Sequence, residues 1–186
     1  MSASAKSSTV LTALRGGSRE SLDRLVPLLY QELRTIAHRQ IARRPEGGTL
    51  ETTGLVHEAY LKLVQQSSAG VHDRAHFLAL ASLAMRHVLV DRAKARGRLK
   101  RDGDRGRITF DANRIAVDDQ PEALLQLDDA LTWLAELEPR LARVVECRFF
   151  GGLTEEEMAA ALGVTVRTIQ RDWAKARMLL RRALES

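Results

Sequence analysis

The stretch of residues 153–177, LTEEEMAAALGVTVRTIQRDWAKAR, limits what this chain can fold into more than any other part of it. Thr154 stands where an N-cap opens a helix, and three glutamates follow it at the end where the helix dipole is positive. Gly163 supplies the backbone freedom that a tight exit requires, and Thr165 stands where it can cap a second helix. The spacing therefore predicts two helices joined by a short turn.

The second of these helices has two distinct faces. Val166, Ile169 and Trp173 recur at helical spacing and are expected to face a core, which favours packing over base stacking for the tryptophan. The polar and basic residues between them are expected to point outward: Arg167, Thr168, Gln170, Arg171 and Lys175. Such a face is typical of the recognition helix that a helix-turn-helix protein lays into the major groove. The alternative is an αα-hairpin with a solvated basic face.

Length and composition narrow the fold class. With 186 residues, 45% of them hydrophobic, the chain is long enough for two small domains, and an aromatic content of only 4% favours helices over strands. We therefore expect an all-α protein. The single cysteine, Cys147, excludes an intrachain disulfide. No apolar run approaches the roughly 18 residues of a membrane span, and no export signal is recognisable, so we expect a cytoplasmic protein without a membrane partner.

The positive charge is concentrated in two places. The net charge is only +5, yet residues 86–107 hold nine Lys or Arg against three Asp, and residues 167–182 hold six against one. The rest of the chain is therefore acidic. Two separated basic runs on an acidic protein favour two contacts with one polyanion, with two solvated helix faces as the alternative.

Hydrophobic periodicity divides the chain into four parts. Residues 1–17 are a polar tail, and residues 18–100 repeat apolar side chains at helical spacing, with a long last helix expected at 75–96. Residues 101–120 have no periodicity and change from basic to acidic, as expected of a flexible linker. The pattern in residues 121–186 predicts a four-helix unit that contains the helix-turn-helix. We expect two small helical domains joined by a flexible linker.

Nothing in the sequence supports catalysis. No phosphate-binding loop, dinucleotide fingerprint or nucleophile elbow occurs. His72 and His76 stand four residues apart, yet no third ligand has a determined position. We expect no catalytic residues, no metal and no cofactor; an enzyme with a metal held by these histidines and a carboxylate is the distant alternative.

Two stretches resemble one known family. Residues 134–184, with the helix-turn-helix, are similar to the fourth conserved region of the extracytoplasmic-function sigma factors, two-domain members of the bacterial sigma-factor family. In residues 22–100, the segment 55–61 (LVHEAYL) resembles the family's polymerase-binding helix, usually written L-V-Q-E-x-F-L. Residues 76–92 resemble the helix that melts the promoter.

This resemblance implies a role for specific residues. It implies a protein that binds core RNA polymerase, brings it to promoter DNA and opens the promoter. The loop of residues 66–74 would lie near the flipped-out base. The helix-turn-helix residues Arg167, Thr168, Gln170 and Arg171 would read the minus-thirty-five element. The minus-ten region would be met by Arg86, Arg92, Lys94 and Arg96. Polymerase would be bound by Leu55, Glu58 and Leu61.

One departure from the family suggests regulation. Members usually carry several acids just before the L-V-Q-E helix, whereas this chain has Glu51, Thr52, Thr53 and Gly54. Our hypothesis is that a Ser/Thr kinase phosphorylates Thr52 or Thr53 and restores the negative charge there, at the N-terminus of a helix. Either threonine could instead be a simple N-cap. An anti-sigma factor is the other regulatory partner that the resemblance leaves open.

The main alternative for the whole chain is a one-component DNA-binding regulator. In that case the front domain would sense a ligand or partner rather than contact polymerase. Transcription initiation with purified core polymerase distinguishes the two, because a repressor or activator does not replace a sigma factor.

Overall fold

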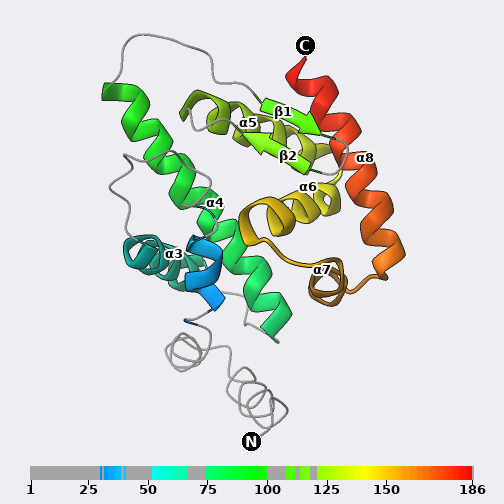
Figure 1. Cartoon of the computed structure of the whole chain (residues 1–186), viewed down its shortest axis with the longest axis horizontal. Coiled ribbons are helices and arrows are strands. Elements are labelled where there is room, and N and C mark those ends of the chain that lie inside the picture. Colours follow the sequence, from blue (N-terminus) through cyan, green and yellow to red (C-terminus); the bar gives the residue numbers. More distant parts are fainter. Residues whose placement is uncertain are drawn as a thin grey trace, which may run out of the picture.

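A single long helix, α4 (Arg74–Leu99), organises the computed structural model of this protein. The helices α3 and α5, the π-helical segment η1 and the helix α7 all contact it, and it runs diagonally between them in Figure 1. Buried side chains recur along most of its length, among them Phe77, Met85 and Val88. The long helix predicted at residues 75–96 is thus confirmed and lies at the centre of the described part of the chain. The structure describes Tyr30, Gln40 and residues 32–38, 52–66, 74–99, 108–111, 114–117 and 121–185.

The N-terminal elements pack on one side of α4. Residues 32–38 are helical, as the periodicity predicts, and α3 (Thr52–Gln66) follows them. Leu55, Ala59 and Leu63 of α3 are buried against α4, and Lys62 of α3 forms a 2.8 Å salt bridge with Asp91 of α4. The predicted tail, residues 1–17, lies outside the described residues.

Part of the predicted linker has regular structure. The strands β1 (Ile108–Asp111) and β2 (Arg114–Val117) form an antiparallel ribbon, with Ile108 opposite Val117 and Asp111 opposite Arg114. The sequence contains a signal for a β-hairpin here, because apolar residues alternate in both stretches and only two residues separate them. All other described elements are helical, so the all-α prediction is confirmed with this ribbon as an addition.

The C-terminal elements are helices that begin and end at residues suited to those positions. They are α5 (Pro121–Leu137), α6 (Pro139–Val145), η1 (Glu146–Gly151), α7 (Glu155–Leu162) and α8 (Val166–Leu184). Pro121 and Pro139 open their helices, where proline loses no hydrogen bond. The segment η1 continues α6, and Gly152 caps its end in a left-handed conformation with φ 63°.

The described part of the chain shares one hydrophobic core. Leu33 and Phe77 from the front of the chain belong to the same cluster of buried residues as Leu131, Phe150 and Ile169 from the back. The division of the chain into two domains at residues 101–120 stays a prediction. No helix among the described residues is long and apolar enough to span a membrane.

Candidate nucleic-acid interface

The first helix of the predicted helix-turn-helix, α7, begins at a complete capping box. The Thr154 hydroxyl accepts a hydrogen bond from the backbone N–H of Glu157 at 3.2 Å, and the Glu157 carboxylate accepts one from the backbone N–H of Thr154 at 3.0 Å. Two backbone donors that a helix start leaves unpaired are satisfied in this way. The prediction of Thr154 as the N-cap is confirmed.

The turn between α7 and α8 also has the predicted geometry. Gly163 lies at φ 65°, ψ 35°, a left-handed backbone conformation that residues with a Cβ atom rarely adopt. Thr165 then caps α8, because its hydroxyl accepts a 3.2 Å hydrogen bond from the backbone N–H of Thr168. Ile169 is fully buried and Met158 packs in the same core. The two helices are therefore held at a fixed angle by a cap, a glycine and a core contact.

Two further contacts fix how α8 is rotated about its own axis. Asp172 is buried, and its carboxylate accepts a 2.6 Å hydrogen bond from Nε of Arg140 on α6, which raises the pKa of this arginine. Trp173 is also buried, with the Arg148 guanidinium 4.6 Å from the centre of its ring. The prediction that Trp173 packs in the core is thus confirmed. Asp172 holds α8 to α6 through Arg140, and its only sequence signal was its position three residues after Ile169, on the inward side of the helix.

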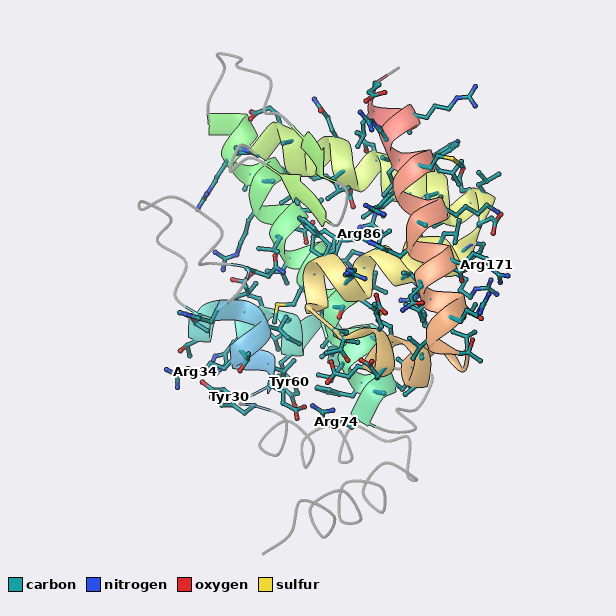
Figure 2. All side chains as sticks on the ribbon, turned by 45° about the vertical axis from the view of Figure 1, so that its right-hand side comes forward. Tyr30, Arg34, Tyr60, Arg74, Arg86 and Arg171 are labelled. Carbon is teal, nitrogen blue, oxygen red and sulfur yellow. The ribbon has the colours of Figure 1, made fainter. Side chains whose placement is uncertain are left out.

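The outer face of α8 presents the predicted polar residues. Arg167, Gln170 and Arg171 are exposed, and Figure 2 shows Arg171 projecting from the outer side of the helix. Thr168 is half-buried, and its hydroxyl lies 2.9 Å from that of Thr165. Lys175 is exposed at 47%. The five residues therefore form one face, with Thr168 turned towards the helix start.

Acidic residues already contact part of this face. The amide of Gln170 donates to Glu155 at 2.7 Å, and Lys175 forms a salt bridge with Glu138. Glu155 also accepts a hydrogen bond from Arg148 at 3.2 Å. Sequence reasoning did not assign these two glutamates a place at the interface, because they come from α7 and from the residue before α6.

The first basic run is divided by the structure. Lys94 is exposed and Arg96 is partly exposed near the end of α4. Arg92 is half-buried and forms a salt bridge with Glu58 of α3, so a predicted DNA contact and a predicted polymerase contact hold each other. Arg86, in contrast, lies inside the protein with 6% of its surface exposed (Figure 2). In this conformation it is out of reach of DNA, which corrects its predicted place on a surface.

Arg86 is buried because carboxylates surround it. Its Nε donates to Asp128 at 2.8 Å and its Nη1 donates to Glu146 at 2.6 Å. Its Nη2 donates to the backbone oxygen of Asp128 at 2.9 Å and to the Thr132 hydroxyl at 3.1 Å. A buried arginine is tolerated only with such a set of partners.

The predicted polymerase face on α3 is also partly internal. Leu55 is fully buried, so it belongs to the core and not to the surface. Leu61 is 56% exposed, and His57 and Thr53, four and eight residues before it, are exposed on the same side of the helix. Thr52, the first residue of α3, is half-buried. Among the three residues named from the resemblance, Leu61 is exposed, Glu58 is partly exposed beside Arg92, and Leu55 is buried.

Other candidate chemistry has little support. Burial raises the pKa of the Cys147 thiol to about 12, which makes this cysteine a poor nucleophile. Within the described ranges, no group of three or more His, Cys, Asp or Glu could hold a metal ion. His72 lies outside those ranges.

The capped α7, the glycine turn and the anchored, basic α8 define the chain as a helix-turn-helix protein of the DNA-binding class. The sequence model of the family described as ECF sigma factor matches residues 4–186. The chain therefore belongs to the ECF sigma factor family of the sigma-70 type, and its role is in transcription initiation. This is a family of transcription regulators, not of enzymes, and it implies core RNA polymerase and promoter DNA as partners. No curated protein matches the chain.

Proposed function

We propose that this protein binds core RNA polymerase, recognises the minus-thirty-five and minus-ten elements of its promoters and opens them. The observation that carries the proposal is the outer face of α8. It is exposed, it is basic, and its rotation is fixed from behind by the Arg140–Asp172 pair and by buried Trp173. A recognition helix needs this arrangement, because a base contact requires the side chain to arrive at a defined angle.

The residues at the start of α8 suit base recognition. Arg167, Thr168, Gln170 and Arg171 occupy the first two turns, and the N-terminal residues of a recognition helix are those that reach base edges. Arginine pairs with guanine and glutamine with adenine through two hydrogen bonds each. Lys175 lies one turn further on, where a backbone phosphate is the more natural partner. These residues would read the minus-thirty-five element.

The end of α4 suits a less specific contact. Lys94 and Arg96 are accessible at the same end of the helix as Arg92, and a run of cations at a helix end neutralises phosphates rather than reading bases. These residues would meet the minus-ten region, where melted DNA also requires a basic surface.

The exposed side of α3 is proposed as the polymerase contact. Leu61 supplies an apolar centre, and Thr53 and His57 extend the same face towards the start of the helix. The first turn of α3, which begins at Thr52, contains no acidic residue, and a negative charge placed there would lie at the positive end of the helix dipole. Phosphorylation of Thr53 would add about −1.5 to −2 charges at this position. Thr53 is the better candidate, because it is exposed and Thr52 is half-buried.

The test of the main proposal is run-off transcription with purified core polymerase on a library of promoters. A sigma factor yields transcripts from a subset of the library with a shared pair of elements. A chain that binds DNA but yields no transcript with core polymerase is instead the one-component regulator.

The phosphorylation proposal has its own test, which is recovery of core polymerase on immobilised protein. The wild type, the double variant Thr52→Ala/Thr53→Ala and the variant Thr53→Glu are compared, each with and without the kinase activity of a cell extract. We expect the strongest recovery with Thr53→Glu and with the treated wild type. Equal recovery from all three proteins would remove the proposal and leave sigma activity untouched.

A further inference from the structure

The side-chain amide of Gln170 is held by a carboxylate from the first helix of the helix-turn-helix. Gln170 is exposed on α8, and its Nε2 donates a 2.7 Å hydrogen bond to Oε2 of Glu155, the first residue of α7. An ionised carboxylate only accepts hydrogen bonds, so the amide nitrogen must face Glu155 and the amide oxygen must face away from it. The contact therefore fixes the orientation of an amide that the backbone of α8 alone leaves free to rotate.

The side chain of Glu155 is itself fixed at both ends. Its backbone follows the capping box that Thr154 makes at the start of α7. Its other carboxylate oxygen, Oε1, accepts a 3.2 Å hydrogen bond from Nη1 of Arg148 on η1, so both oxygens of Glu155 have a partner. A side chain held in this way has little rotamer freedom, and it passes that order on to the group it binds.

Arg148 connects this contact to the core. Its guanidinium lies 4.6 Å from the centre of the ring of Trp173, which is buried and stands three residues after Gln170 on the same helix. The side chains of Arg148 and Glu155 are only 31% and 30% exposed, so water competes less for their hydrogen bonds than it does at an open surface. The exposed amide of Gln170 is thus tied, through Glu155 and Arg148, to the hydrophobic core.

The neighbouring residues of the recognition face are supported differently. Arg171 is exposed and has no hydrogen bond or ion pair among the described residues. The hydroxyl of Thr168 lies 2.9 Å from that of Thr165, which is a contact within the start of α8 itself. Gln170, in contrast, is tied by its side chain to the other helix of the helix-turn-helix.

The groups that remain on the amide match one base. The amide nitrogen carries two hydrogens, of which Glu155 takes one, so one N–H donor and the oxygen acceptor remain. In the major groove adenine presents a donor at N6 and an acceptor at N7, which this pair satisfies when Glu155 holds the hydrogen that lies away from the amide oxygen. Guanine presents two acceptors there and would be repelled by that oxygen.

We propose that Glu155 is a positioning residue for Gln170, and that Gln170 held in this way reads an adenine in the minus-thirty-five element. The inference rests on the proposed function, which makes α8 the recognition helix. Glu155 contacts no base itself. It orders the amide before DNA arrives, so this side chain does not have to be ordered on binding, which is an effect of roughly 2- to 10-fold in Kd for the correct base.

The test is selection of binding sites from a duplex library that is randomised over the element. The full chain is used, both alone and together with core RNA polymerase. The wild type should select adenine at one position, and Gln170→Ala should have no preference there. Glu155→Ala should reduce the preference for adenine at that position roughly 2- to 10-fold and leave the other positions unchanged. Glu155→Gln keeps an acceptor oxygen and should retain more of this preference than Glu155→Ala.

Two controls separate positioning from charge and from folding. Glu156→Ala is the matched control, because Glu156 is an exposed acid in the same first turn of α7 and has no hydrogen bond or ion pair among the described residues. Both alanine variants remove one negative charge beside the DNA and should raise the affinity for all sequences alike. The double variant Glu155→Ala/Gln170→Ala should match Gln170→Ala at the adenine position, because Glu155 acts through Gln170. Thermal unfolding followed by circular dichroism checks that each variant is folded.

The possible failures are distinguishable. If Glu155→Ala selects adenine as strongly as the wild type, or if Glu156→Ala weakens that preference to the same extent, the positioning role is overturned and the proposed function stands. If Gln170→Ala still selects the wild-type sequence, or if the position that it affects prefers another base, the contact between Gln170 and adenine is wrong and the inference falls with it. If the selections behave as expected but no transcript forms with core polymerase, the sigma-factor role fails and the pair remains a reader of adenine.

Discussion

Replacing Arg171 by alanine separates base recognition from general affinity for DNA. Arg171 is exposed on the outer face of α8, and the structure gives it no hydrogen bond or ion pair among the described residues. Its removal leaves no buried partner unsatisfied, so the free energy of unfolding should change by less than about 0.5 kcal/mol. Any effect on DNA binding then reflects the interface alone.

The expected loss follows from one contact to a base. A bidentate arginine–guanine pair contributes about 1–3 kcal/mol of discrimination, and 1.4 kcal/mol is tenfold in Kd. Arg171→Ala should therefore weaken binding to the preferred sequence about 5- to 150-fold and leave the substituted position with little preference. Binding to sequences that already carry another base there should change much less.

The assay is selection of binding sites from a randomised duplex library, followed by affinity measurements at two salt concentrations. Arg181→Ala is the matched control, because Arg181 is exposed at the far end of the same helix and forms an ion pair with Glu185, which is four residues further on. Arg96→Ala is the comparison for phosphate contact and should weaken all sequences alike and reduce the salt slope by about 1. If Arg171→Ala and Arg96→Ala both weaken binding without any change in preference, the division into base-reading and phosphate-binding residues is wrong.

Three further predictions concern stability and partner binding. Thr154→Ala removes the capping box of α7 and should lower the free energy of unfolding by about 1 kcal/mol in urea titration, with a comparable loss for Thr165→Ala at α8; unchanged midpoints would contradict the capping role. Leu61→Ser should reduce recovery of core polymerase, whereas Met178→Ser, equally exposed on α8, should not; equal recovery would remove α3 as the contact. Burial raises the pKa of Cys147 from 9.0 to about 12, so the neutral thiol contributes stability that is fully present below pH 9 and is lost as the pH rises towards 12. In urea titrations across this pH range, the free energy of unfolding should fall less steeply for Cys147→Ala than for the wild type. Parallel declines would contradict this prediction.

The helix-turn-helix was predictable because its determinants are local. Thr154, Gly163 and Thr165 act on backbone groups within four residues of themselves, so their effect can be read from spacing alone. The inward and outward faces of α8 follow from the same logic, since the helical period fixes which side chains share a face. The partners of the outer face were not predictable, because Glu155 and Glu138 meet α8 only through the tertiary fold.

Arg86 and Leu55 show where sequence reasoning fails. A basic run suggests a surface, and only the position of α4 between the other helices turns Arg86 inward while Lys94 stays exposed. Leu55 belongs to a motif associated with polymerase binding, but its helical phase with Ala59 and Leu63 directs it to the core. For Arg86 the missing information is which side of α4 its neighbours cover, whereas for Leu55 the helical period already indicates burial and only the resemblance pointed to the surface.

Some of the side chains that we propose as DNA contacts already have partners within the protein. Lys175 forms a salt bridge with Glu138, and Gln170 donates a hydrogen bond to Glu155, so two groups that we propose as DNA contacts have acidic partners in the protein itself. For Lys175, DNA binding is an exchange of partners, because the carboxylate of Glu138 must be separated before a phosphate takes its place. Each phosphate that a protein cation neutralises releases counterions from DNA and adds about 0.9 to the slope of log K against log salt concentration. When that cation first leaves a protein carboxylate, however, the carboxylate attracts counterions of its own. The observed slope should therefore be smaller than the number of basic residues at the interface suggests.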